Sequence, residues 1–145
     1  MRFDKFTLKV QEAMQDAQQL AGQFGHQGVD VEHLFLAMLR QPEGVVQSIL
    51  ERIGANIRNV ETNLEKALDR LPRVSGTGAG GQVYITPRLK NVLDNSFEEA
   101  RRLTDEYVSS EHILLAITQD KQGPSAQILG NRERSEEHTS ELQSH

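Results

Sequence analysis

Two glutamate–histidine pairs, Glu32-His33 and Glu111-His112, stand out first in this sequence for their chemistry. A carboxylate beside an imidazole can perform acid–base catalysis or bind a metal ion. The sequence contains no H-E-x-x-H motif, however, and nothing places a third ligand near either pair. Each pair is expected in the first turn of a short helix, where the helix dipole favours the carboxylate. We therefore expect structural roles and no metal site, with a small hydrolase as the less favoured alternative.

A glycine-rich segment, residues 76–81, matches the G-x-G-x-x-G pattern of dinucleotide-binding loops. Such a loop follows a strand and opens a helix, whereas here a helix is expected before it and the next begins only near Thr86. The Gly-Lys-Ser/Thr of a P-loop is absent, and the Ser, His and Asp residues occur without the context of a catalytic triad. The segment therefore predicts a flexible linker over residues 73–83, and we expect no catalytic residues.

Composition excludes several further classes of function. The 145 residues are 37% hydrophobic and 26% charged, which is typical of one globular domain. The net charge of −5 argues against a nucleic-acid partner. The absence of cysteine rules out disulfides and thiolate zinc sites. No signal peptide is visible and the longest strongly apolar stretch, residues 34–39, cannot span a membrane, so we expect a cytoplasmic protein.

The elements that must position these residues are predicted by an internal repeat with a spacing of 79 residues. The two copies align without gaps and share Thr7/Thr86, Val29/Val108, Glu32/Glu111, His33/His112 and Ile49/Ile128. Apolar residues at helical spacing predict four helices in the first copy. The apolar stripes of these helices lie within residues 6–24, 31–40, 45–53 and 57–71. The second of these is apolar nearly all round and should be buried.

Helix starts are indicated in both copies. Thr7 and Thr86 are expected N-caps, and Pro87 occupies the first helical position after Thr86. Asp30 and Ser109 are expected to cap the two short helices that carry the Glu-His pairs. The predicted fold is therefore all-α, with two four-helix units related by a pseudo-twofold axis: repeat one spans residues 6–71 and repeat two residues 84–131.

The last residues, 134–145, do not continue the repeat. They have no helical stripe of apolar residues and resemble the translation of a sequencing-adapter oligonucleotide. We expect this tail to be non-native, so that the domain covers residues 1–131 and the second copy is truncated before its fourth helix.

Five segments resemble the N-terminal Clp repeat domain of ClpB-type chaperones. They are MRFDKFT (1–7), EHL (32–34), RLPRVSG (70–76), QVYITP (82–87) and DEYVSSEH (105–112). The resemblance implies a module that binds unfolded or aggregated polypeptide at the front of a homohexameric, ATP-driven disaggregase that works with the DnaK system. ATP and Mg would belong to the parent, while this fragment would be no enzyme and would hold no cofactor. The alternative is an adaptor-docking domain of a ClpA- or ClpC-like protease unfoldase.

The resemblance also implies a binding site. The polar residues that contact substrate in the family fall on Thr7, Asp105 and Glu111, and its apolar groove falls near Leu93 and His112. From the repeat alone, a seam between the two units lined by Met14 and Leu93 would suit an extended apolar peptide. The alternative is that Met14 and Leu93 belong to the core. We expect protein partners, with no nucleic acid and no membrane.

Overall fold

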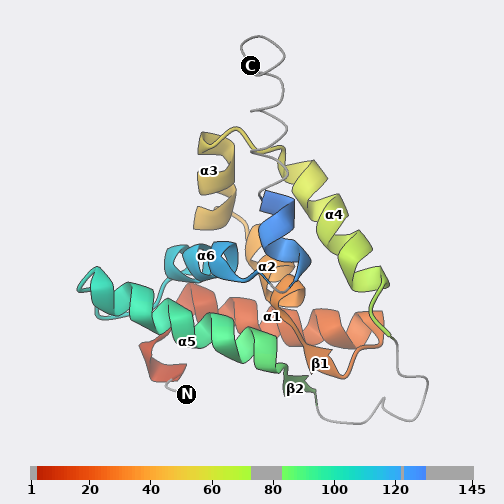
Figure 1. Ribbon diagram of the computed structural model, residues 1–145, viewed down its shortest axis with the longest axis horizontal. Coiled ribbons are helices and arrows are strands. Elements are labelled where there is room, and N and C mark those ends of the chain that lie inside the picture. Colours follow the sequence, from red (N-terminus) through yellow and green to blue (C-terminus); the bar gives the residue numbers. More distant parts are fainter. Residues whose placement is uncertain (1–2, 73–82, 122, 130–145) are drawn as a thin grey trace.

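The computed structural model describes residues 3–72, 83–121 and 123–129. Within these ranges the fold is all-α, as predicted (Figure 1). A 3-10 turn, η1 (Phe3–Lys5), precedes the helices α1 (Leu8–Phe24), α2 (Val31–Leu39), α3 (Val45–Arg52), α4 (Ile57–Asp69), α5 (Pro87–Arg102) and α6 (Ser110–Gln119). Residues 124–129 are also helical. The linker at residues 73–82, the expected tail at 134–145 and the position of an eighth helix lie outside the described residues.

The helices begin where the caps predict. The Thr7 hydroxyl accepts a hydrogen bond from Val10 N at 3.3 Å, and the Thr86 hydroxyl accepts one from Leu89 N at 3.1 Å. Pro87 takes the first position of α5, where its missing N–H costs nothing. Each threonine therefore satisfies a backbone donor that its helix leaves open.

The short helix α2 lies at the centre of the molecule, with α1 and α5 below it in Figure 1. All nine of its residues are buried, so the sequence prediction of a buried helix is confirmed. Helices α3 and α4 flank α2 on either side, and α6 lies beside it. The buried apolar residues of both repeats form one cluster, so each repeat completes the core of the other. Among the described residues, no helix combines the length and hydrophobicity needed to cross a bilayer.

Two short backbone pairings join the repeats and were not predicted. The strands β1 (Gly28–Val29) and β2 (Tyr84–Ile85) pair in parallel, with Val29 opposite Ile85. A second parallel bridge joins Phe6 to Val108. A shift of 79 residues converts each pairing into the other, because Phe6 corresponds to Ile85 and Val29 to Val108. The two bridges are therefore related by the pseudo-twofold axis, and they bring the start of each long helix beside the start of the other repeat's short helix.

Candidate functional site

The histidines of the two Glu-His pairs both form hydrogen bonds that cap the N-termini of their helices. His33 Nδ1 accepts a hydrogen bond from Asp30 N, and His112 Nδ1 accepts one from Ser109 N, each at 2.9 Å. Asp30 and Ser109 complete the capping boxes of α2 and α6. Because Nδ1 accepts in each neutral ring, the proton must reside on Nε2. The structure therefore gives both histidines the local structural role that the sequence indicated.

The two histidines donate from Nε2 to different partners. His33 lies 2.9 Å from His26 Nδ1, and His112 lies 2.9 Å from Asp105 Oδ2. Positions 26 and 105 are equivalent in the repeat, so one site has been filled by an imidazole in one copy and by a carboxylate in the other. Burial lowers the pKa of His33 to about 4, with a further lowering from His26 that outweighs the opposing charge of Glu32. His33 is therefore neutral in the folded protein near pH 7.

The two glutamates differ from each other more than the two histidines do, both in burial and in hydrogen-bond partners. Glu32 is only 2% exposed and accepts hydrogen bonds from Arg88 at 2.9 and 3.2 Å. It also accepts a 2.6 Å hydrogen bond from the Ser125 hydroxyl. Glu111 is exposed and makes no hydrogen bond or ion pair with any described residue. The first glutamate is thus part of the internal structure, and the second is available to a partner.

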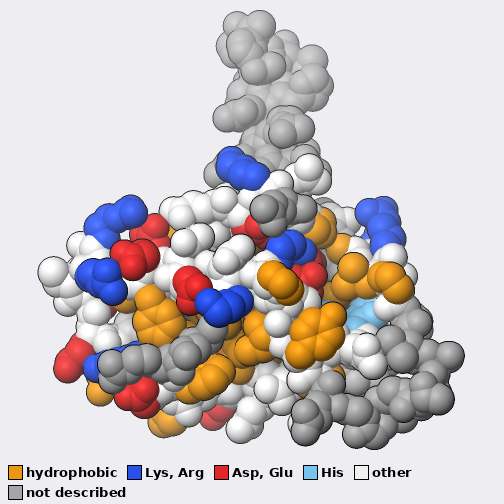
Figure 2. Space-filling model, turned by 60° about the horizontal axis from the view of Figure 1, so that its bottom comes forward, with side chains coloured by type: hydrophobic (Ala, Val, Ile, Leu, Met, Phe, Trp, Pro, Cys, Tyr) orange, Lys and Arg blue, Asp and Glu red, His pale blue; other side chains and the backbone are white. Residues whose placement is uncertain are grey.

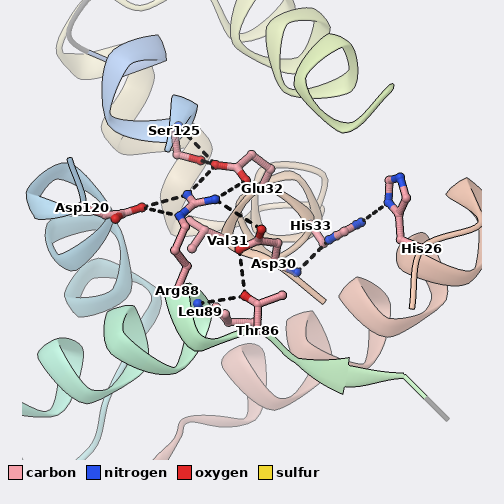
Figure 3. A network of polar contacts seen from close by, with 10 residues as sticks. All are labelled: His26, Asp30, Val31, Glu32, His33, Thr86, Arg88, Leu89, Asp120 and Ser125. Atoms are coloured by element: carbon pink, nitrogen blue, oxygen red, sulfur yellow. Dashed lines mark hydrogen bonds and ion pairs between the residues drawn. The ribbon is translucent and has the colours of Figure 1, made fainter. Parts of the chain in front are cut away.

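Arg88 is the centre of a polar network that joins the two repeats (Figure 3). Its guanidinium contacts Glu32, lies 2.8 Å from Asp120 Oδ2 and lies 3.3 Å from Asp30 Oδ2. Burial acts to lower the pKa of Arg88, but the hydrogen bonds to Glu32 and Asp120 and the charges of Glu32 and Asp30 raise it above its ordinary value. Sequence reasoning missed Arg88, because its partners are far apart in the chain.

Three of the six predicted site residues lie at the surface. Asp105 is exposed and lines a hollow of about 560 Å³ together with Lys5, Phe97 and Val108. Thr7 and Glu111 line another pocket, of about 350 Å³, between the starts of α1 and α6. We call this second hollow the Glu111 pocket; its other lining residues include Lys9, Gln41, Val45 and Ser109.

The other three predicted site residues are buried. Leu93 is fully buried, Met14 is 5% exposed and His112 is 4% exposed. Met14 and Leu93 belong to the common core and do not form the wall of an open seam. His112 donates a hydrogen bond to Asp105 and thereby fixes the position of that exposed carboxylate.

The open apolar surface lies between α3, α6 and residues 124–129. A groove of about 570 Å³ is lined there by Ile49, Ile53, Leu114, Leu115, Ala126 and Leu129, with Glu111 at its edge. Ile53 and Leu115 are 47% and 44% exposed. Elsewhere, the face shown in Figure 2 carries hydrophobic side chains in its middle, with Lys, Arg, Asp and Glu side chains around them. The described residues hold no group of three His, Asp or Glu side chains arranged to bind a metal ion.

This geometry agrees with what comparison with known proteins shows. A family model described as the Clp repeat (R) N-terminal domain matches residues 5–132. The chaperone protein ClpB of Nitratidesulfovibrio vulgaris is 43% identical over 131 residues, which is 90% of this chain and 15% of the relative. The negative regulator of genetic competence ClpC/MecB of Bacillus subtilis is 33% identical over 90% of this chain and 16% of its own length. The chain therefore spans about 15% of the length of the curated relatives it matches.

Solved structures share the fold. The Hsp104 N-terminal domain from Candida albicans superposes with a TM-score of 0.76 at 19% identity, covering 89% of this chain and 82% of that domain. A ClpV N-domain in complex with a VipB peptide superposes with a TM-score of 0.70 at 20% identity, covering 80% and 69% of the two chains.

Proposed function

Because this chain belongs to the family of Clp repeat N-terminal domains, we propose that it is the polypeptide-binding module of a ClpB-type disaggregating chaperone. Its partners would be unfolded or aggregated chains. The parent would be a cytoplasmic homohexamer that uses ATP and Mg in modules outside this fragment and works with the DnaK system. The strong representation of ClpB among the relatives supports the ClpB-type parent.

One observation carries the binding proposal. Asp105 and Glu111 present carboxylates at the surface, and each borders a hollow that also has apolar walls. An unfolded chain offers apolar side chains together with backbone N–H donors, and such a rim can accept those donors while the hollows accept the side chains. Met14 and Leu93 are buried in the common core and His112 is buried with a hydrogen bond to Asp105, so these three residues would act through the fold and not by contact with the bound chain.

The test is the binding of a permanently unfolded model protein, such as reduced and carboxymethylated α-lactalbumin, measured by fluorescence anisotropy. Asp105→Ala and Glu111→Ala should each weaken binding by about three- to tenfold, the loss of roughly one charge-assisted hydrogen bond. Glu51→Ala is the matched control, since Glu51 is exposed on α3 and is not among the residues that line the two hollows or the Glu111 pocket. Unchanged binding in both variants would refute the site assignment.

Asp105→Ala also removes the hydrogen bond from His112, so Asp105→Asn should be measured beside it. The asparagine oxygen keeps an acceptor for His112 but removes the charge. If only the alanine variant weakens binding and also unfolds at a lower urea concentration, the role of Asp105 is structural and not one of contact.

The second candidate is an adaptor-docking domain, which the ClpC/MecB relative favours. Such a domain binds a folded surface, so the unfolded model protein should then fail to bind even at high concentration. Saturable binding of the unfolded protein, with no binding of its native form, favours the chaperone module.

A further inference from the structure

The two long helices end in the same hydrogen-bonded turn. At the end of α5, Asp105 N donates to Ala100 O at 2.8 Å and Thr104 N donates to Arg101 O at 3.0 Å. This pair of bonds is the Schellman motif, which places a left-handed residue just after the helix. The equivalent bonds end α1, where Gly25 is the left-handed residue. Both repeats therefore turn the chain in the same way before their short helices.

In each repeat, the residue that follows this turn contacts the capping histidine of the short helix. In repeat one it is His26, which lies 2.9 Å from His33 Nε2, as Figure 3 shows. In repeat two it is Asp105, which lies 2.9 Å from His112 Nε2. Two hydrogen bonds thus fix Asp105, one through its backbone N–H and one through its carboxylate, while 51% of its side chain stays exposed. The turn therefore sets the direction in which this carboxylate faces solvent.

Thr104 has the left-handed conformation that the motif needs, with a φ of 56°. Gly25, at the equivalent position, has a φ of 77°, in a region that glycine enters at no steric cost. A β-branched residue is an outlier there, and it persists only where the surrounding structure fixes it. The Thr104 hydroxyl offsets part of the strain, because it donates to Leu103 O at the open end of the helix. Repeat two thus keeps a strained residue directly before the exposed carboxylate.

The segment after α5 is fixed at its far end as well. Val108 N donates to Lys5 O at 2.8 Å, and Thr7 N donates to Val108 O at 3.0 Å. Residues 103–107, between the two fixed ends, are exposed, so core packing does little to place them. The left-handed turn at position 104 is therefore what lets this short segment reach both ends and bring its carboxylate against the capping histidine.

We propose that Thr104 is a positioning residue for polypeptide binding, whose left-handed backbone holds the Asp105 carboxylate against His112 and aims it at the bound chain. The inference rests on the proposed function, in which Asp105 contacts the polypeptide. Thr104 itself does not touch the bound chain. Its contribution is preorganisation, because a carboxylate that is already held in place loses less conformational freedom on binding.

Three substitutions in the intact 145-residue chain separate position from stability. Thr104→Gly keeps the left-handed turn without the strain, so the chain should unfold at a higher urea concentration and bind the unfolded model protein with unchanged affinity. Thr104→Pro fixes φ at about −65° and removes the N–H donor, so it should weaken binding about three- to tenfold, as Asp105→Ala does. Gly25→Ala is the matched control, because it strains the equivalent turn of repeat one. It should lower the urea midpoint and leave binding unchanged.

A spectroscopic measurement reports the position of the carboxylate directly. The Nε2–H resonance of ¹⁵N-labelled His112 depends on its hydrogen bond to Asp105. Thr104→Pro should shift this resonance toward its position in Asp105→Ala, whereas Thr104→Gly should leave it in place. A variant with one glycine inserted between Thr104 and Asp105 keeps both side chains but breaks the register of the turn. It should behave as Thr104→Pro does, and it replaces that variant if the proline prevents folding.

Binding that is weakened by Thr104→Gly, or unchanged in the proline and insertion variants, would overturn the inference. An equal weakening by Gly25→Ala would also overturn it, because loss of stability alone would then account for the effect. Unchanged binding in Asp105→Ala would instead refute the proposed contact of Asp105, whatever the variants of Thr104 show.

Discussion

At the scale of single residues, the same capping histidine serves two environments. Both histidines are buried, but His33 donates to an imidazole, whereas His112 donates to an exposed carboxylate. A histidine that is held neutral in the folded state opposes its own protonation, so repeat one contains a site at which acid favours unfolding.

The sign of the pH dependence follows from the pKa of His33, which falls from 6.5 to about 4 on folding. A group whose folded pKa is depressed binds more protons in the unfolded state as the pH falls below 6.5. Lowering the pH from 7 to 5 should therefore cost about 2 kcal/mol of unfolding free energy. His26→Asp gives His33 the carboxylate that His112 has, and it should reduce this loss by about half or more.

Urea unfolding followed by circular dichroism at pH 7 and pH 5 measures the effect. His26→Asn is the control, because its amide oxygen accepts from His33 without adding a negative charge, and it should keep the larger part of the acid sensitivity, which comes from the burial of His33. An equal loss of stability in His26→Asp and the unsubstituted chain would contradict this account of the His26–His33 pair.

At the scale of elements, the helix starts could be predicted from the sequence and the contacts between repeats could not. A cap such as Thr7 acts on a backbone N–H three residues away, so the signal is local. The strands β1 and β2 are two residues long, too short to show an alternating pattern. Met14 and Leu93 show the same limit, since a helical stripe predicts an apolar face but not whether another repeat covers it.

The two capping threonines should differ in their contribution to stability. Thr7 accepts one cap hydrogen bond at 3.3 Å, whereas Thr86 accepts one at 3.1 Å and also donates to Asp30. Thr7→Ala should cost about 1 kcal/mol of unfolding free energy, and Thr86→Ala about 2 kcal/mol. Urea unfolding of both variants decides the order. Thr7→Ser and Thr86→Ser, which keep the hydroxyl, should recover most of the loss, and a larger cost for Thr7→Ala would contradict the prediction.

At the scale of the whole molecule, the Arg88 network is a feature that the sequence does not predict, because its residues are distant in the chain and meet only in the fold. Glu111 could be selected from its place in a recognised segment, but its availability depends on Lys9 standing where Arg88 stands in the other repeat. The effect of that difference is visible only in the structure, where Asp30, Glu32 and Asp120 all contact the Arg88 guanidinium. The network also ties the first helix of repeat two to the short helix of repeat one.

Removing the Arg88 network should lower the free energy of unfolding of both repeats together. Arg88→Met leaves Glu32 buried with Ser125 as its remaining described partner, and it should cost about 2–4 kcal/mol of unfolding free energy. Adding Glu32→Gln to Arg88→Met should recover part of that loss, because the uncompensated charge is then gone. Arg101→Met is the control, since its ion pair with Glu98 is exposed and lies within α5, and it should cost less than about 0.5 kcal/mol. If Arg88→Met cost no more than Arg101→Met in urea unfolding, the Arg88 guanidinium would not hold the two repeats together.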